Sequence, residues 1–217
     1  MSSDKLASWD NKSLEVVSKL LSLDADLTVV ATDDAALLKK SMTGRFPFLE
    51  KPDGGVISDF LPIARVLGQN HALFNGAGEA DRQQVNMWCD HINGACVPAA
   101  KRLVAQCNGS QKVTMDMRAF SMGLGDLRSS LASIESHLKL RNFLVGHSLT
   151  LADVLLVCLL AQAFSFVVDK KTRENVLPNT TRYVSLCMQI PAFARVYSDV
   201  FAPCKDALFT PAETGSK

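Results

Sequence analysis

The sequence has 217 residues, 47% of them hydrophobic, so it can bury a sizeable core in one large domain or in two smaller domains that share an interface. Its formal net charge is only +1, and it has no basic stripe interleaved with aromatic residues, which argues against direct nucleic-acid binding. Its N-terminus lacks the apolar stretch of a secretory signal, and its six cysteines are scattered without a CxxC pair, which is typical of reduced thiols in a cytoplasmic protein.

The first 42 residues alternate between strand and helix patterns. Residues 5–9 predict a short strand, and the helix that follows has Asn11 or Ser13 as its expected N-cap and apolar residues at helical spacing. The continuous β-branched run at residues 27–31 predicts a buried strand. A short helix is then expected at residues 33–42, opened by two aspartates.

Two more strands and a helix complete this half of the chain. Residues 45–49 and 56–57 flank a Pro-Asp-Gly-Gly turn and predict a hairpin, and residues 60–67 predict a helix. The resulting order β-α-β-α-β-β-α is that of a thioredoxin-like α/β domain. Pro47 falls inside a predicted strand, where it cannot donate to the ladder, so a cis bond between Phe46 and Pro47 is expected. Such a turn leaves the backbone of the preceding residue free to pair with a peptide-like ligand. The alternative is a proline on an edge strand, without a ligand.

The second half of the chain is predicted to be entirely helical. A Gly- and Asn-rich stretch separates it from the first half. One long helix is expected at residues 81–107, with a kink at Pro98, and a second at residues 113–138, weakened in its middle by Gly123 and Gly125. Helices of this length should pair antiparallel. We therefore predict a thioredoxin-like domain at 1–69, a linker at 70–80, a helical domain at 81–209 and a tail at 210–217.

A buried helix after Thr150 is the centre of this helical half. Thr150 and Asp153 have the spacing of a capping box, and residues 154–160 are all apolar, so the helix must lie inside a helical assembly. Asp153, Gln162 and Ser165 interrupt the apolar run, which argues against a membrane span. Two shorter helices, each beginning near a proline, are expected at residues 178–188 and 191–200.

Several motifs of this sequence resemble those of a single protein family. The stretches Phe-Leu-Val-Gly at 143–146 and Thr-Leu-Ala-Asp at 150–153, and the segment from Pro178 to Val196, are similar to the transferase-like N-terminal domain of the gamma subunit of translation elongation factor 1B. Gly-Arg-Phe-Pro at 44–47 resembles the turn of that family, and animal valyl-tRNA synthetases carry a similar appended domain. The resemblance implies a cytosolic glutathione transferase fold, with a thioredoxin-like N-terminal domain and an all-α C-terminal domain.

The resemblance also indicates where a glutathione site would lie. A working transferase needs a Tyr, Ser or Cys just after the first strand, where Ser8 is the candidate donor, although a surface serine is the commoner interpretation. An acid-Ser pair at the start of the third helix would bind the γ-glutamyl end. That pair aligns with Asp59 and Phe60, which lacks the hydroxyl, or with Ser58 and Asp59 if the helix starts one residue earlier. With Phe46 and Pro47, Asp59 is consistent with a vestigial pocket.

Three functional hypotheses follow from this resemblance. The first is a non-catalytic module that scaffolds the elongation factor 1B complex by binding its guanine-nucleotide-exchange subunits. The second is a glutathione or related thiol transferase that uses Ser8, and the third is a domain of an aminoacyl-tRNA synthetase assembly. A homodimer through the first two long helices is also expected. No metal is predicted, because the four histidines lack metal-ligand spacing with the cysteines.

Overall fold

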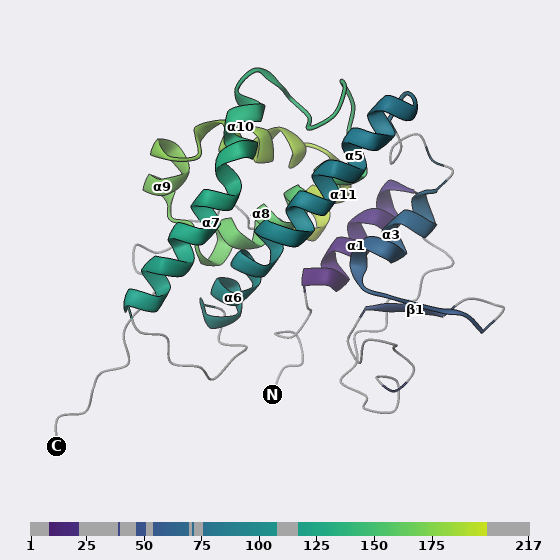
Figure 1. Ribbon diagram of the computed structural model, residues 1–217, viewed down its shortest axis with the longest axis horizontal. Coiled ribbons are helices and arrows are strands. Elements are labelled where there is room, and N and C mark those ends of the chain that lie inside the picture. Colours follow the sequence, from purple (N-terminus) through teal and green to yellow (C-terminus); the bar gives the residue numbers. More distant parts are fainter. Residues whose placement is uncertain are drawn as a thin grey trace.

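The computed structural model describes residues 9–21, 39, 47–50, 54–69, 71, 76–107 and 117–198. These residues form a helical assembly with a two-stranded hairpin at one end (Figure 1). The predicted strand at 27–31, the helix at 33–42 except for residue 39, which is in a turn, the bond between Phe46 and Pro47, Ser8 and the tail at 210–217 lie outside the described residues.

Helix α1, Trp9–Leu20, begins earlier than its sequence suggested. The predicted strand is wrong at Trp9, which is the first residue of the helix, and Asn11 and Ser13 are internal residues of α1 rather than its N-cap. Ser13 is fully buried and interacts with Cys158 of helix α8, Leu151–Phe166, so its hydroxyl serves the packing of the two helices instead of the helix start. Helix α1 packs against α8, α3 (Phe60–Gly68) and α11 (Pro191–Val196).

The predicted hairpin and the helix after it are confirmed. Strands β1, Phe48–Glu50, and β2, Val56–Ser58, are antiparallel, and helix α3, Phe60–Gly68, follows directly. Gly54 in the turn has a φ of 82°, which side chains rarely adopt. Pro47, however, lies just before β1 and not inside it, so its missing N–H removes no ladder bond.

The first long helix contains a wider turn in its middle. Helix α5, Glu79–His91, continues through the π-helical turn η2, Ile92–Cys96, into α6, Val97–Cys107. Pro98 stands just after this turn, where the hydrogen bond that a proline cannot donate is already displaced from the regular α-helical pattern. The irregularity thus lies at residues 92–96, just before Pro98, where the sequence predicted a kink.

Helix α7, Met117–His137, runs antiparallel to this path and ends in the short 3₁₀ turn η3, Leu138–Leu140. Gly123 has low helix propensity, but it lies where α7 and α6 approach each other closely. A Cβ atom at this position would lie 3.0 Å from a methyl group of Leu103 on α6, so glycine permits the close approach of the two helices.

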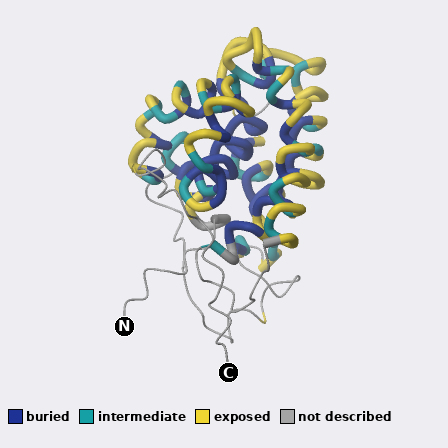
Figure 2. The backbone as a smooth tube through the Cα atoms, turned by 90° about the vertical axis from the view of Figure 1, so that its left-hand side faces the viewer, coloured by how far each residue is buried: buried dark blue, intermediate teal, exposed yellow. Residues whose placement is uncertain are grey.

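Helix α8, Leu151–Phe166, lies at the centre of the molecule, as predicted. Its residues from 151 to 161 are all buried. The elements that pack around it are α1, α3, α5, α6, η2 and α10 (Pro178–Cys187). Figure 2 shows these buried segments in the interior, with exposed residues on the outer faces of the surrounding helices. None of the described helices is both long enough and apolar enough to span a membrane.

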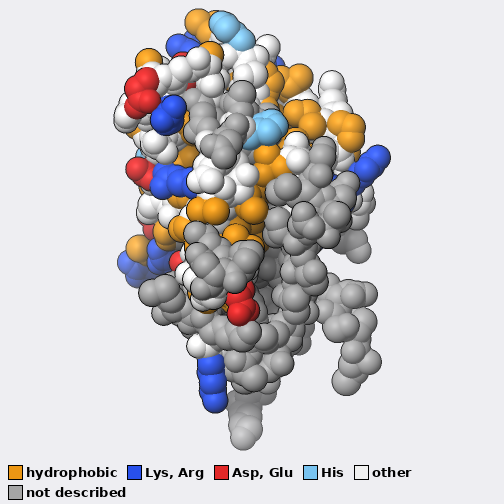
Figure 3. Space-filling model, turned by 90° about the vertical axis from the view of Figure 1, so that its right-hand side faces the viewer, with side chains coloured by type: hydrophobic (Ala, Val, Ile, Leu, Met, Phe, Trp, Pro, Cys, Tyr) orange, Lys and Arg blue, Asp and Glu red, His pale blue; other side chains and the backbone are white. Residues whose placement is uncertain are grey.

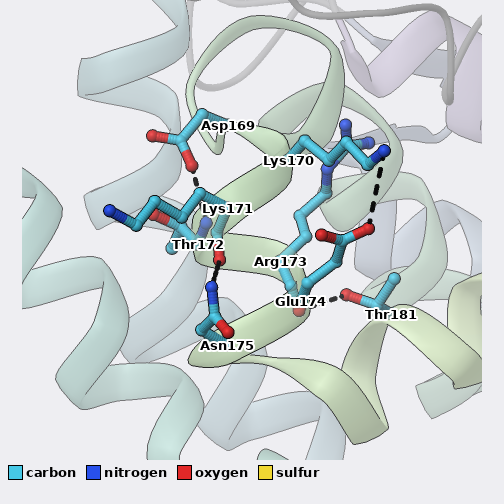
Figure 4. A network of polar contacts seen from close by, with 8 residues as sticks. All are labelled: Asp169, Lys170, Lys171, Thr172, Arg173, Glu174, Asn175 and Thr181. Carbon is cyan, nitrogen blue, oxygen red and sulfur yellow. Dashed lines mark hydrogen bonds and ion pairs between the residues drawn. The ribbon is translucent and has the colours of Figure 1, made fainter.

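Three short helices follow. Helices α10, Pro178–Cys187, and α11, Pro191–Val196, both begin at a proline as predicted, although α11 is shorter than expected. Helix α9, Lys170–Asn175, was not predicted, because its sequence is polar throughout. Asp169 caps it by accepting a hydrogen bond of 2.6 Å from the Thr172 amide, and Figure 4 shows this contact beside the ion pair of Lys170 with Glu174.

Candidate functional site

The start of α3 is the first candidate site, and it contains a strained residue. Asp59 has φ 75° and ψ 150°, a region that only glycine adopts readily, and it is the one non-glycine residue with positive φ in the part of the chain that the structure describes. Its amide donates a hydrogen bond of 3.0 Å to the Pro47 carbonyl. The junction between β2 and α3 is thereby fastened to the residue before β1.

The helix boundary distinguishes the two alignments of the acid-Ser pair. Helix α3 begins at Phe60 with Asp59 as its N-cap, while Ser58 ends β2 opposite Phe48. Phe60 is only 3% exposed, so its ring packs into the core at the position where the first alignment requires a hydroxyl. The structure thus brings together Pro47, Ser58, Asp59 and Phe60, whereas Ser8 and Phe46 lie outside the described residues.

The capping box at the start of α8 is formed and is deeply buried. Asp153 is fully inaccessible to solvent, and its Oδ2 accepts hydrogen bonds from the Thr150 amide at 2.8 Å and the Thr150 hydroxyl at 2.7 Å. Its Oδ1 accepts from the Leu144 amide and the Tyr183 hydroxyl, both at 2.8 Å. Burial raises the pKa of Asp153 above its usual value, and these hydrogen bonds partly oppose that rise.

Glu135 of α7 caps a helix other than its own. Its Oε1 accepts from the Asn179 amide at 2.8 Å and side chain at 2.7 Å, and its Oε2 accepts from the Thr180 amide at 2.8 Å and hydroxyl at 2.6 Å. Both amides belong to the first turn of α10, where a negative charge is favoured. Sequence reasoning missed this contact, and the only available signal was the pair Asn179-Thr180 after the proline that starts α10.

Arg182 of α10 fastens the end of α7 to the loop before α8. Its Nη1 donates to Oδ1 of Asn142 at 2.8 Å, and its Nη2 donates to the carbonyls of Leu138 and Arg141, each at 2.7 Å. One guanidinium group therefore binds three acceptors that lie within five consecutive residues, 138–142. Arg182 was part of the family resemblance, but its role could not be inferred from the sequence.

The cysteines have environments that suppress reactivity. The five described cysteines are free, and four of them are buried. Desolvation raises the pKa of Cys89 and of Cys158 to about 12 and that of Cys96 to about 11, so these thiols stay protonated at neutral pH. No group of three or more metal-binding side chains occurs in the described ranges.

His91 and Ser133 form a contact that resembles a catalytic pair. The Ser133 hydroxyl lies 3.2 Å from Nε2 of His91, but the same nitrogen lies 3.3 Å from the Ser130 carbonyl. Because a carbonyl only accepts hydrogen bonds, the contact with Ser130 requires the tautomer with its proton on Nε2, and in that tautomer this nitrogen cannot accept the proton of Ser133. This contact therefore serves the packing of α5 against α7.

Comparisons with known proteins agree with this arrangement. The family model described as "Glutathione S-transferase, C-terminal domain" matches residues 121–191. Among solved structures, the GST-like domain of elongation factor 1-gamma from Saccharomyces cerevisiae superposes with a TM-score of 0.77 at 16% identity, covering 95% of each chain. A Vibrio parahaemolyticus glutathione S-transferase of class Gtt2 gives 0.71 at 18% identity, covering 94% of this chain and 96% of that one. The chain is therefore a protein of the glutathione transferase fold.

Relatives found by sequence similarity identify the chain more narrowly than its fold does. Elongation factor 1-gamma of Sus scrofa is 31% identical over 163 residues, which are 75% of this chain and 37% of the relative. A probable elongation factor 1-gamma of Arabidopsis thaliana is 28% identical over 190 residues, or 86% of this chain and 45% of the relative. The chain is thus related to the elongation factor 1-gamma proteins, which confirms the resemblance, and it spans less than half the length of these relatives.

Proposed function

We propose that this chain is a non-catalytic, transferase-like interaction module of the elongation factor 1B complex. In this role it scaffolds the complex in the cytoplasm by binding the subunits that exchange guanine nucleotide. The observation that carries the proposal is the similarity to elongation factor 1-gamma over 75% of the chain. The buried ring of Phe60 supports it, because the position that would bind glutathione through a hydroxyl is occupied by a core residue.

The proposed domain division follows from the gap between two helices. Helix α3 ends at Gly68 and α5 begins at Glu79, which supports a thioredoxin-like domain at 1–69, a linker at 70–80 and a helical domain at 81–209. The residues at 210–217 are proposed to be a tail. In this division the interaction module consists of both domains, because α8 of the second packs against α1 and α3 of the first.

A glutathione or thiol transferase is the second candidate, and the strain at Asp59 favours it. Strained backbone persists where its surroundings enforce it, and it is concentrated at ligand-binding sites. Asp59 is exposed at the N-terminus of α3, and its side chain accepts no capping hydrogen bond from the first-turn amides. This geometry supports a retained anchor for a charged ligand, but it supplies no group to activate a thiol.

The proposed homodimer must use a different surface from the one that the sequence suggested. Trp88, Cys89, Ile92 and Cys96 share a helical face, but all are buried inside the domain. The exposed residues of η2 are Asn93, Gly94 and Ala95. We propose that two copies pair there, and static light scattering at micromolar concentration tests this.

Reconstitution with purified proteins tests the scaffold proposal. The chain is mixed with each purified exchange subunit of elongation factor 1, and in parallel with a valyl-tRNA synthetase, and the mixtures are analysed by size-exclusion chromatography with light scattering. A stable complex with an exchange subunit is expected. A catalytically active glutathione transferase of the same fold is the control and should elute alone. Failure to bind any exchange subunit overturns the proposal, and binding to the synthetase alone selects the synthetase-assembly hypothesis.

A further inference from the structure

An apolar side chain stands almost fully in solvent between two cations at the end of α7. Leu140 is 92% exposed, the most exposed large hydrophobic side chain of those described, and Lys139 and Arg141 on either side of it are also exposed. We call these three residues the 139–141 surface. Single exposed apolar residues are common on proteins, so the exposure of Leu140 alone would carry little weight.

The backbone beneath the 139–141 surface is fixed in place. Arg182 donates to the carbonyls of Leu138, just before the surface, and of Arg141, its last residue, and the Arg141 amide donates to the Leu138 carbonyl at 3.3 Å. Leu138 itself is fully buried and anchors the turn in the core. The exposure of Leu140 is therefore a property of an ordered turn, which presents the side chain without further loss of backbone entropy on binding.

The charge around this turn has one sign. No Asp or Glu occurs at residues 136–152 or 175–198, the two segments that form η3 with its following loop and α10 with α11. The nearest acid in sequence, Glu135, is engaged by four donors at the start of α10. The far end of the loop approaches Asp81, whose carboxylate accepts from the Ala77 amide at 3.0 Å. Within the described ranges, Lys139 and Arg141 form no ion pair.

Other exposed cations do have partners. Arg65 pairs with Asp90 at 3.2 Å and Arg82 pairs with Glu79 at 3.4 Å. On the face in Figure 3, acidic and basic side chains likewise lie interspersed. The cations of the 139–141 surface have no such partners in the described residues, so their charges remain available to a binding partner.

We propose that the 139–141 surface is a docking site for an acidic protein segment that also carries apolar side chains. Carboxylates of the segment pair with Lys139 and Arg141, and its apolar side chains cover Leu140. A nucleic acid fits less well, because Leu140 offers neither charge nor a hydrogen bond to phosphate and only two cations are available. The docking site rests on the proposed function only for the identity of its partner, an exchange subunit of elongation factor 1.

A first experiment tests the surface without assuming that partner. The full chain, labelled with ¹⁵N, is titrated with a synthetic amphipathic helical peptide that carries leucines on one face and glutamates on the other. The amide resonances of residues 138–142 and of Arg182 should change their chemical shifts, and Leu140→Ser should abolish these changes. The proposal is overturned if the shifts move elsewhere, or if Leu140→Ser titrates like the wild type.

A second experiment uses the purified exchange subunit and calorimetry. Leu140→Ser and the double variant Lys139→Glu/Arg141→Glu should each weaken binding by about tenfold or more. Matched controls are Met122→Ser, which changes an exposed apolar residue near the other end of α7, and Arg118→Glu/Lys171→Glu, which makes the same change in charge elsewhere. Both controls should bind within about twofold of the wild type. Thermal unfolding midpoints confirm that each variant is folded.

The outcomes separate the two proposals. If the wild-type chain binds no exchange subunit, the proposed function fails, while the peptide titration still decides the docking site. If the wild type binds and all variants bind equally, the docking site is wrong and the proposed function stands. If Lys139→Glu/Arg141→Glu weakens binding to tRNA while Leu140→Ser changes nothing, the surface contacts phosphate and the docking proposal is overturned.

Discussion

The hydroxyl of Tyr183 on α10 donates a hydrogen bond of 2.8 Å to Oδ1 of Asp153 on α8, and both residues are fully buried. The same carboxyl group accepts from the Leu144 amide and from both donors of Thr150. One side chain thus joins the loop before α8, the first turn of α8 and the middle of α10. The helix cap is therefore also a tertiary contact.

Removal of this carboxyl group should strongly destabilise the protein. Asp153→Ala leaves the buried amides of Leu144 and Thr150 and the Tyr183 hydroxyl without an acceptor, so we expect the free energy of unfolding to fall by about 2–4 kcal/mol. Urea denaturation measures the change. Tyr183→Phe removes one of these bonds and should cost about 1–2 kcal/mol. Equal midpoints for Asp153→Ala and the wild type would show that the cap contributes nothing.

The buried carboxyl group also predicts a pH dependence. Burial raises the pKa of Asp153 above the ordinary value of 3.8, so the folded chain binds this proton more tightly than the unfolded chain. The stability contributed by this proton is complete below the ordinary value and is lost as the pH rises through the folded pKa. The stability of the wild type relative to Asp153→Asn, which does not titrate, should therefore fall as the pH rises above the ordinary value of 3.8. Parallel stability curves for the two proteins over this range would contradict the assignment.

The capping box could be predicted because its residues are three positions apart, whereas its tertiary partners could not. Tyr183 lies 30 residues from Asp153, and Thr180 lies 45 residues from Glu135. No local pattern specifies such pairs, because they depend on how α10 packs against α7 and α8. The prediction for Ser13 was wrong for a different reason. Its residue type suggested the start of a helix, but it lies on the buried face of α1.

Long apolar patterns gave the most accurate predictions of elements. The helices α5 to α8 and the hairpin were expected from periodicity and turn residues, because burial repeats along such elements. Helix α9 was missed, because it is six residues long and is held by a cap and by tertiary contacts rather than by an apolar stripe. At the candidate site, the sequence left two alignments open, since the start of a helix is uncertain by a residue until its backbone is placed.

The cap that Glu135 provides to α10 should also be measurable. Glu135→Ala removes the acceptor of four hydrogen bonds at the start of α10, and we expect the free energy of unfolding to fall by about 1–3 kcal/mol. Glu135→Gln keeps one acceptor oxygen and should lose less. Chemical denaturation measures the stability of both variants. A Glu135→Gln variant that is less stable than Glu135→Ala would contradict the prediction.

Thiol labelling should separate the cysteines by burial. Cys89, Cys96, Cys158 and Cys187 are buried, and desolvation raises the pKa of each, so iodoacetamide should leave them unmodified in the native protein at about pH 8. Cys107 is partly exposed and should react. Peptide mass spectrometry identifies the modified residues, and denatured protein is the control in which every thiol should react. Rapid native labelling of Cys89 or Cys158 would show that α5 or α8 opens readily.

Glutathione should bind weakly to this chain. Phe60 occupies the first position of α3, where the first of the two alignments with the family places a serine, and its ring is buried. Loss of one charge-assisted hydrogen bond costs about 1.5–3 kcal/mol, or roughly ten- to a hundredfold in affinity. Isothermal titration calorimetry measures this affinity. Ser58→Ala should leave it unchanged, because Ser58 belongs to β2 and not to the helix start.

Conjugation should be slow even where glutathione binds. Four of the five described cysteines are buried, and α3 begins with Phe60, which has no hydroxyl, so the thiol of bound glutathione should stay mostly protonated at neutral pH. An assay with chlorodinitrobenzene at saturating glutathione should show little turnover above the uncatalysed rate. Ser8→Ala is the decisive variant, because Ser8 is the one residue that the sequence offers as a thiol-activating donor. Micromolar binding together with turnover that Ser8→Ala abolishes would replace the scaffold with an enzyme.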